Sequence, residues 1–181
     1  MSNNDIPYIE SDLYRIRHSA AHVMAEAVLQ SFPEAKLAIG PPIEDGFYYD
    51  FDLGQDENGK PITFSPEDLE KIEADMKNLL KSNAKFEQSS MSIPEAKAYF
   101  ADAPYKLELI EELAAGKVDE NGNPISEPVQ EVGIYTQRDF VDLCRGPHVD
   151  YTKQVKANAV KLLRTSGAYW RGDENRPQLQ R

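Results

Sequence analysis

The chain has 181 residues, which is enough for one domain with its own hydrophobic core, and its formal net charge is −11. This charge argues against a broad basic face that binds a nucleic-acid backbone. The acidic excess is uneven, because the stretch from Lys153 to Arg181 holds seven basic residues and two acidic ones. Contacts with a polyanion are therefore expected to be few and local, or to be made by another domain.

The sequence gives no signal for export or for membrane insertion. Its apolar runs are shorter than the ~18 residues that a membrane span needs. The first residues, Met1 to Asp5, form neither a basic nor an apolar segment. The single cysteine cannot form an internal disulfide. These features predict a cytoplasmic protein with a reduced thiol and no membrane partner.

The first expected elements are a helix and a β-hairpin. A helix is predicted over about residues 12–32, with Asp12 as its cap and Pro33 just beyond its end. The next segment, residues 36–52, contains two strand-like arms around the turn residues 44–46, so it is expected to form a hairpin. His18 and His22 lie on the flank of the apolar stripe of the helix, which suits a site at the edge of a core.

The rest of the chain mixes helices and strands irregularly. Helices are expected over about residues 65–82, 92–100 and 106–115, and strands over 86–91, 129–136, 140–143 and 160–169. Residues 171–181 are polar and show no core pattern. This order favours the α+β class, with an antiparallel β-sheet and helices packed over it.

All the histidines and the only cysteine fall into two pairs, each with a spacing of four residues: His18 with His22, and Cys144 with His148. These residue types bind transition metals, move protons at neutral pH and act as nucleophiles. Each one alone is more often a satisfied surface or core residue, and a lone cysteine is usually a small buried hydrophobe. The Gly146-Pro147 step excludes a helix in the second pair, so a turn must present both side chains. Together the four are predicted to form one site.

Several ordered motifs resemble the editing domain of bacterial threonyl-tRNA synthetases. They are Arg17-His18-Ser19-Ala20-Ala21-His22, Ala38-Ile39-Gly40-Pro41, Gly46-Phe47-Tyr48-Tyr49-Asp50, Tyr105-Lys106, Asp142-Leu143-Cys144-Arg145-Gly146-Pro147-His148 and Ser166-Gly167-Ala168-Tyr169-Trp170-Arg171-Gly172-Asp173. The resemblance covers about residues 10–181 and implies the second additional domain type that threonyl- and alanyl-tRNA synthetases share.

The resemblance also implies a division of the chain. Residues 1–9 would be an N-terminal tail, residues 10–165 the editing domain, and residues 166–181 a linker toward an aminoacylation domain that this sequence does not contain. The small ubiquitin-like domain that usually precedes the first histidine motif in the family is also expected to be missing. Such a chain could deacylate a charged tRNA but could not charge one.

In the family, the editing domain hydrolyses seryl-tRNA that the synthetase has made by mistake. Threonine and serine differ by one methyl group, which a binding pocket distinguishes by only ~1–3 kcal/mol, so a second site completes the selection. The resemblance implies that His18 orients or deprotonates water and that Lys106 assists the leaving oxygen. The implied substrate-binding residues are His22, Tyr49, Asp142, Cys144 and His148. The implied partners are the acceptor end of tRNA(Thr) carrying serine and the rest of the synthetase.

Four alternatives remain open at this stage. The set His18, His22, Cys144 and His148 is competent to bind zinc, as in the alanyl-type editing domains, although the resemblance favours no required metal. Cys144 beside Arg145 could act as a thiolate nucleophile, but direct attack by water is simpler for an ester. The domain could also bind the tRNA acceptor end without hydrolysing it, or could be a structural domain stabilised by zinc.

Overall fold

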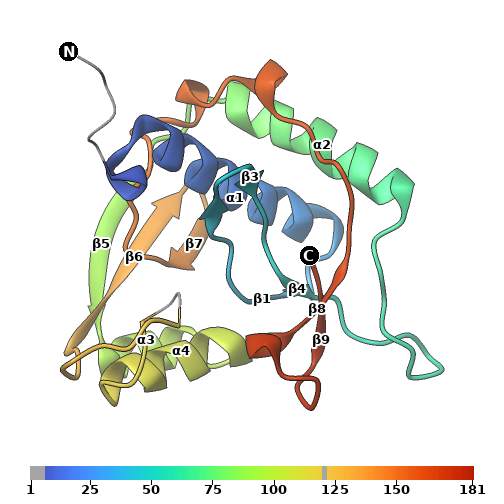
Figure 1. Ribbon diagram of the computed structural model, residues 1–181. Helices are drawn as coiled ribbons and strands as arrows, with labels where there is room; N and C mark the ends of the chain where they lie inside the picture. Colours follow the sequence, from blue (N-terminus) through green and yellow to red (C-terminus); the bar gives the residue numbers. More distant parts are fainter. Residues whose placement is uncertain (1–6, 120–121) are drawn as a thin grey trace.

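The structure is a computed structural model that describes residues 7–119 and 122–181, and it has the predicted α+β architecture (Figure 1). Within these ranges the strands form three separate antiparallel sheets rather than one: a four-stranded sheet with the order β1-β4-β9-β8, the pair β2-β3, and a three-stranded sheet with the order β5-β6-β7. Four short 3-10 helices, Tyr8–Glu10, Thr152–Gln154, Ala157–Ala159 and Trp170–Gly172, occur in the described connections.

Helix α1, Asp12–Ser31, is the central helix of the fold. Its cap is Ser11, whose hydroxyl accepts a hydrogen bond from the backbone N–H of Tyr14 at 3.1 Å, so the prediction that Asp12 is the cap is wrong by one residue. A serine oxygen satisfies an N–H that the first turn cannot pair internally. The middle of the helix is rich in buried alanine, which lets neighbouring elements approach it closely.

The predicted hairpin over residues 36–52 is present, but its arms are interrupted. Strand β1, Lys36–Leu37, pairs with β4, Phe51–Asp52, while β2, Pro42–Ile43, pairs with β3, Gly46–Phe47. The interruption is expected, because the two consecutive prolines in one arm lack the N–H groups that continue a ladder. The broken arms curve past α1, which contacts both β2 and β3.

Helix α2, Pro66–Lys81, lies beside α1 on the outer side of the molecule (Figure 1). It begins with the capping box expected from the sequence, in which Ser65 and Asp68 exchange hydrogen bonds. Helices α3, Ile93–Tyr99, and α4, Pro104–Ala114, lie together at the opposite end of the molecule from α2. All three helices thus fall within two residues of their predicted bounds.

The sheet of β5, Glu87–Ser92, β6, Glu131–Gln137, and β7, Phe140–Leu143, separates two hydrophobic cores. Tyr135 and Phe140 belong to the core that also contains the buried face of α1. Ile134 and Leu143 belong to the core that contains the buried face of α4. The two-residue alternation of a strand produces this division, and it sends Asp142 and Cys144 to the face opposite Leu143.

The C-terminal segment differs from the prediction. Residues 160–166 are not a strand; β8 covers only Gly167–Tyr169, and a further strand, β9, covers Gln178–Gln180. Strand β9 pairs with β8 and also with β4, and it fully buries Leu179, so the prediction that residues 171–181 lack a core pattern is wrong. The division at residue 165 into domain and linker stays a prediction.

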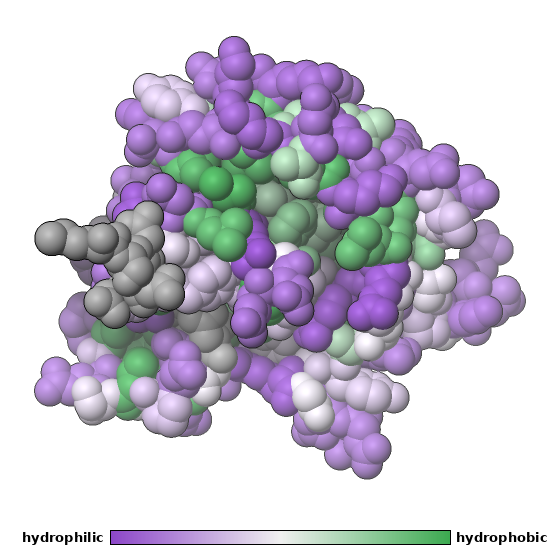
Figure 2. Space-filling model, turned by 45° about the horizontal axis from the view of Figure 1, so that its top comes forward, coloured by the Kyte–Doolittle hydropathy of each residue, from purple (hydrophilic) through white to green (hydrophobic). Residues whose placement is uncertain are grey.

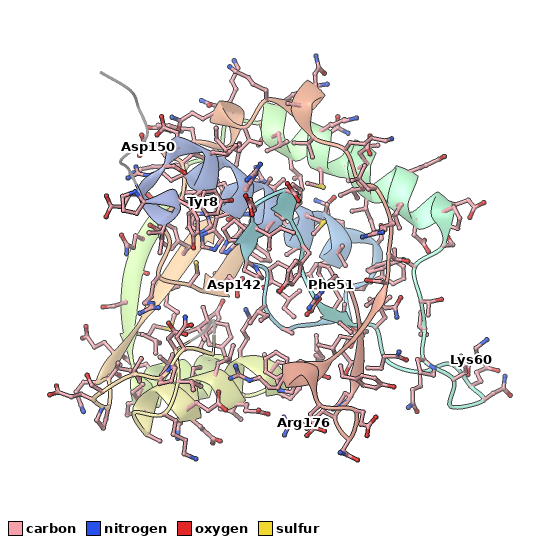
Figure 3. All side chains as sticks on the ribbon, viewed as in Figure 1. Tyr8, Phe51, Lys60, Asp142, Asp150 and Arg176 are labelled. Carbon is pink, nitrogen blue, oxygen red and sulfur yellow. The ribbon has the colours of Figure 1, made fainter. Side chains whose placement is uncertain are left out.

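The surface in Figure 2 is mostly hydrophilic, with separate patches of hydrophobic residues between charged and polar ones. Among residues 7–119 and 122–181, none of the helices has the length and apolar character that crossing a bilayer requires. Figure 3 shows charged and polar side chains extending outward around the whole fold, while Asp142 and Phe51 lie toward its middle.

Candidate active site

Four residues that are far apart in the sequence converge between α1 and the end of β7. His18 and His22 come from adjacent turns of α1, and Cys144 and His148 come from the segment that follows β7. One side-chain N or S atom from each of the four lies within 4.8 Å of those of the others, and all four residues are buried. The structure therefore brings the two pairs together in one place at the edge of a core, as the sequence predicted.

The sulfur of Cys144 is the centre of this cluster. Its Sγ atom lies 3.4 Å from Nε2 of His18 and 3.3 Å from Nε2 of His148. The backbone N–H of Gly146 donates to the same sulfur over 3.2 Å. A sulfur that receives a backbone N–H and faces two imidazole nitrogens is suited to metal binding or to sharing a proton with a histidine.

The hydrogen bond of His18 with the backbone defines its reactive nitrogen. Nδ1 of His18 lies 3.2 Å from the carbonyl oxygen of Pro147. Because a carbonyl oxygen can only accept, Nδ1 carries the proton and Nε2 keeps its lone pair. That lone pair points into the cluster, where it can accept a proton from water or from the thiol of Cys144.

Ser19 orients His148 in a similar way. Its hydroxyl oxygen lies 3.1 Å from Nδ1 of His148 and accepts the backbone N–H of Val149 over 3.0 Å. The ring of His148 also packs between two aromatic rings, with centroids 5.0 Å from Phe86 and 4.4 Å from Tyr135. Its position is thus fixed by packing as well as by hydrogen bonding.

Burial keeps the three imidazoles neutral at neutral pH. Burial lowers the pKa of His18 to about 4, although the hydrogen bond to Pro147 and the charge of Asp142 act in the opposite direction. Burial also holds the pKa of His22 and of His148 well below the ordinary value, and neighbouring histidines lower both further. Neutral imidazole is the form that accepts a proton or binds a metal ion.

A charged network adjoins the histidines. Nζ of Lys106, from α4, lies 2.6 Å from one carboxylate oxygen of Asp142, and it donates to the hydroxyl of Tyr49 over 3.1 Å. That hydroxyl donates to the other oxygen of Asp142 over 2.6 Å, and Nε2 of His22 lies 3.6 Å from the same oxygen. Burial raises the pKa of Tyr49 well above its ordinary value, and Asp142 raises it further, so the hydroxyl stays protonated.

Two features outside the predicted site hold Tyr49 in place. A Cβ atom on Gly40 would lie 2.0 Å from the ring of Tyr49, so only glycine allows this close approach. The residue next to Tyr49, Asp50, accepts two hydrogen bonds of 2.8 Å from the guanidinium of Arg181. Arg181 of the C-terminal segment therefore helps to hold Asp50 and the adjacent Tyr49 in position, which the sequence pattern did not indicate.

A small cavity opens beside these groups. It holds about 50 Å³ and is lined by α1, by the hairpin segment 39–42, by Lys106 and Leu109 of α4, and by the end of β7. This volume accommodates a few water molecules at most before side chains adjust. Tyr14 also lines it, at the edge of the His18 ring with a centroid separation of 5.6 Å.

The structure brings together all seven site residues predicted from the sequence: His18, His22, Tyr49, Lys106, Asp142, Cys144 and His148. Three further residues with a role in the geometry were missed, namely Ser19, Tyr14 and Gly40. Ser19 lies between the two histidines in the first motif, and this position was the signal that could have identified it. The roles of the seven residues in a reaction stay predictions.

The residues also fit a zinc ion geometrically. Zinc bonds of about 2.0–2.3 Å in a tetrahedron place the ligand atoms roughly 3.3–3.8 Å apart. The two Sγ to Nε2 distances, 3.4 and 3.3 Å, lie in this range. Nδ1 of His22 is buried without a hydrogen-bond partner, and the outer nitrogens of His18 and His148 have polar partners of the kind that orient metal ligands.

Comparison with known proteins identifies the relationship. Residues 132–181 match the family described as the threonyl and alanyl tRNA synthetase second additional domain. Threonine–tRNA ligase from Dehalococcoides mccartyi is 54% identical over 171 residues, which cover 94% of this chain and 25% of the relative. The corresponding ligases of Pelobacter propionicus and Borreliella burgdorferi are 49% and 45% identical over 92% and 95% of this chain.

The chain spans about a quarter of the length of these curated relatives, 25%, 23% and 26% respectively. Within that quarter, the similarity extends over almost every element described above. The resemblance to the editing domain of bacterial threonyl-tRNA synthetase is thereby confirmed, and residues 132–181 match the threonyl and alanyl tRNA synthetase second additional domain family.

Proposed function

We propose that this domain hydrolyses seryl-tRNA(Thr) and spares threonyl-tRNA(Thr). The observation that carries the proposal is that a proton acceptor and a proton donor, His18 and Lys106, line the same small cavity. A neutral histidine with a defined free nitrogen, His18, lies beside the charged network of Lys106, Asp142 and Tyr49. An acceptor for a proton of water and a donor for a leaving oxygen are the two requirements of ester hydrolysis.

The proposed reaction begins with water held at Nε2 of His18. As the water oxygen bonds to the ester carbonyl carbon, Nε2 accepts one of its protons, and the carbonyl oxygen becomes an oxyanion. When the tetrahedral intermediate collapses, the bond from the carbonyl carbon to the ribose oxygen breaks, and the ribose oxygen takes a proton. The ammonium of Lys106 hydrogen-bonds or protonates that oxygen. The products are serine and a free hydroxyl on the terminal ribose.

The remaining polar groups suit binding of the amino acid. Asp142 is a buried carboxylate that can accept a hydrogen bond from the substrate ammonium, and Tyr49 and His22 adjoin it. The space beside them, about 50 Å³, favours the smaller of two side chains. Excluding the extra methyl group of threonine by such a site would supply the second selection step that a single binding pocket cannot provide.

The proposed partners are the acceptor end of tRNA(Thr) and the remaining domains of a synthetase. A chain with a net charge of −11 has little electrostatic attraction for tRNA, so the isolated domain should work only at high enzyme concentration. We also propose the division into residues 1–9, 10–165 and 166–181. A domain that proofreads charged tRNA acts where tRNA is charged, which is the basis for proposing a cytoplasmic location.

The test is incubation of the purified chain with tRNA(Thr) charged with serine, threonine or alanine, followed by measurement of the released amino acid. We expect release of serine and little release of threonine. Equal release of serine and threonine would defeat the proposed size selection. Binding of charged tRNA without release would support instead the alternative of a non-catalytic module for the acceptor end.

A zinc-dependent hydrolase of the alanyl type is the second candidate, and the spacing of the four ligand atoms favours it specifically. His18, His22, Cys144 and His148 would hold the ion, which would stabilise the fold or, with one position open, activate water. We place this candidate second, because binding of all four ligands would occupy His18 and leave no position for substrate. No metal is required in the reaction that we propose.

A further inference from the structure

The C-terminal segment, residues 167–181, binds two elements of the candidate site at once. It lies beside α4, which carries Lys106, and beside β4, which follows Tyr49 (Figure 1). Three of its arginines are spaced five residues apart, and each one pairs with a carboxylate of another element. Together with one tryptophan they form what is called here the C-terminal clamp: Trp170, Arg171, Arg176 and Arg181.

The first arm of the clamp holds α4. The indole N–H of Trp170 donates to Oε1 of Glu108 over 3.1 Å, and the guanidinium of Arg176 pairs with Oε2 of the same carboxylate. The guanidinium of Arg171 pairs with Glu112, which lies one turn further along the helix. Because charge-assisted bonds hold two successive turns, this arm fixes the rotation of α4 about its axis as well as its position.

Trp170 also contacts the residue that precedes Lys106. Its ring lies 5.1 Å from the ring of Tyr105, centroid to centroid, in an edge-to-face arrangement. The hydroxyl of Tyr105 donates to Asp52 of β4 over 2.6 Å. The backbone that carries Lys106 is therefore held between the clamp and β4.

The second arm holds the chain around Tyr49. Strand β9 pairs with β4, and Arg181, which follows β9, donates two hydrogen bonds of 2.8 Å to Asp50. The same guanidinium lies 3.8 Å from the centroid of the Tyr48 ring. Two parallel bonds between a guanidinium and a carboxylate fix direction as well as distance. Both neighbours of Tyr49 in the chain are thus bound by one arginine.

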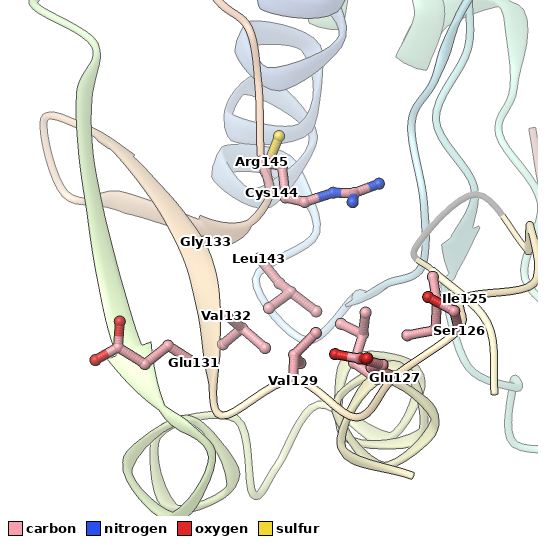
Figure 4. A pocket seen from close by; sticks show the side chains of 11 residues that line it. Ile125, Ser126, Glu127, Val129, Glu131, Val132, Gly133, Leu143, Cys144 and Arg145 are labelled. Atoms are coloured by element: carbon pink, nitrogen blue, oxygen red, sulfur yellow. The ribbon is translucent and has the colours of Figure 1, made fainter. Parts of the chain in front are cut away.

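Helix α4 depends on such contacts, because its packing against the sheet is incomplete. A cavity of about 150 Å³ lies between Leu113 of α4, residues 125–129 and the strands β6 and β7, and Figure 4 shows Val132 and Leu143 at its wall. A well-packed interior fills such a volume with side chains, and walls that face a void lose their dispersion attraction. The sheet alone therefore does not determine where α4 lies.

We propose that the C-terminal clamp positions the ammonium of Lys106 against the hydroxyl of Tyr49. The inference rests on the proposed function, in which Lys106 assists the leaving oxygen. The contact of 3.1 Å between these two groups joins the two elements that the arms of the clamp hold. The clamp residues are positioning residues, since they act on the reaction through Lys106 and do not touch the substrate.

The first experiment weakens the arm on α4. Glu108→Gln removes the charge at its centre with little change in size, and Glu111→Gln is the matched control on the same helix, where Glu111 pairs only with Lys97 at 3.9 Å among the ion pairs of the described residues. Glu108→Gln should lower kcat for release of serine by about tenfold and leave KM within about twofold, because a displaced Lys106 affects a step after binding. Arg176→Gln should do the same, Arg176→Lys should retain most of the rate, and the control should change neither constant.

A double-mutant comparison separates positioning from a general disturbance of the fold. In Lys106→Met the group to be positioned is absent, so adding Glu108→Gln should change the remaining rate by less than about twofold. A general disturbance would lower the rate by the same factor in both backgrounds, and that result would overturn the proposal. The rates are measured at a temperature at which circular dichroism shows every variant to be folded.

The second experiment needs no reaction. The side chain of Lys106 is 4% exposed, so the acetyl ester of N-hydroxysuccinimide should modify it far more slowly than Lys85, which is 59% exposed. Peptide mass spectrometry measures the ratio of the two labels. Glu108→Gln and Arg181→Gln, one for each arm, should raise the labelling of Lys106 by about tenfold, because local opening exposes the amine. Glu111→Gln should leave it unchanged.

The two experiments let the proposals fail separately. Equal rates of serine release in Glu108→Gln, Arg176→Gln and the unmodified chain would overturn the clamp and leave the proposed function standing. A chain that releases no serine would defeat the proposed function, and the labelling of Lys106 would then decide on the clamp. A rise confined to the clamp variants supports positioning, and equal labelling in all variants overturns it.

Discussion

The ion pair between Lys106 and Asp142 allows the sharpest test of how this site is built. The two groups lie 2.6 Å apart with side-chain exposures of 4% and 2%. A surface pair of similar length exists elsewhere on the fold: Lys71 and Asp75 lie 2.8 Å apart with exposures of 59% and 26%. Lys106→Met removes a buried ammonium at nearly constant side-chain length, and Lys71→Met makes the same change at the surface.

The expected magnitudes differ because the remaining carboxylates differ in solvation. Removing one partner of a buried pair costs about 3–5 kcal/mol, because an uncompensated charge stays buried. Tyr49 still donates to Asp142 over 2.6 Å, so the lower end, about 3 kcal/mol, is expected. For a chain of this size, 1 kcal/mol corresponds to a change in Tm of about 2–4 °C, so Tm should fall by about 6–12 °C. Lys71→Met should cost about 0–1 kcal/mol.

Thermal unfolding followed by circular dichroism measures both variants. The double variant Lys106→Met with Asp142→Leu should regain most of the lost Tm, because no isolated charge remains, while release of serine stays at least 10²-fold reduced. A Tm loss in Lys106→Met no larger than in Lys71→Met would refute the reasoning.

Three further predictions concern the histidines, the metal and Tyr49. His18→Ala should slow release of serine by about 10²-fold. The pH–rate profile of the unmodified chain should show no inflection near pH 6.5 but a decline toward pH 4, because the pKa of His18 lies at about 4 and the neutral imidazole persists above that pH. For the same reason the unfolded chain binds more protons than the folded one between these values, so Tm should fall as pH decreases from about 6.5 to about 4. Metal analysis should find well under one zinc per chain, and the activity should survive a chelator. Stoichiometric zinc would support the zinc-dependent candidate instead if Cys144→Ser lowered both the zinc content and the Tm. Gly40→Ala should lower both Tm and the rate of serine release, because the added methyl group meets the ring of Tyr49, and unchanged values would show that the ring is not held there.

The sequence by itself determined most of the local elements and indicated which residues form the candidate site. The capping box at Ser65 and the 3.6-residue spacing of apolar residues specify α2 without reference to the rest of the chain. The spacing of His18 and His22 on one helix face likewise depends only on local geometry. The turn after Cys144 follows from glycine and proline, whose backbone restrictions are also local.

The tertiary structure alone decided which distant groups meet. Strand β9 was missed because a three-residue strand has no pattern of its own, and it forms only where β4 and β8 offer free edges. The ion pair of Lys106 with Asp142 depends on the packing of α4 against the edge of β7, which no spacing in the sequence encodes. The low pKa of His18 results from burial by elements on both sides. These properties arise from contacts between separate segments of the chain or from the exclusion of water, and both exist only in the folded chain.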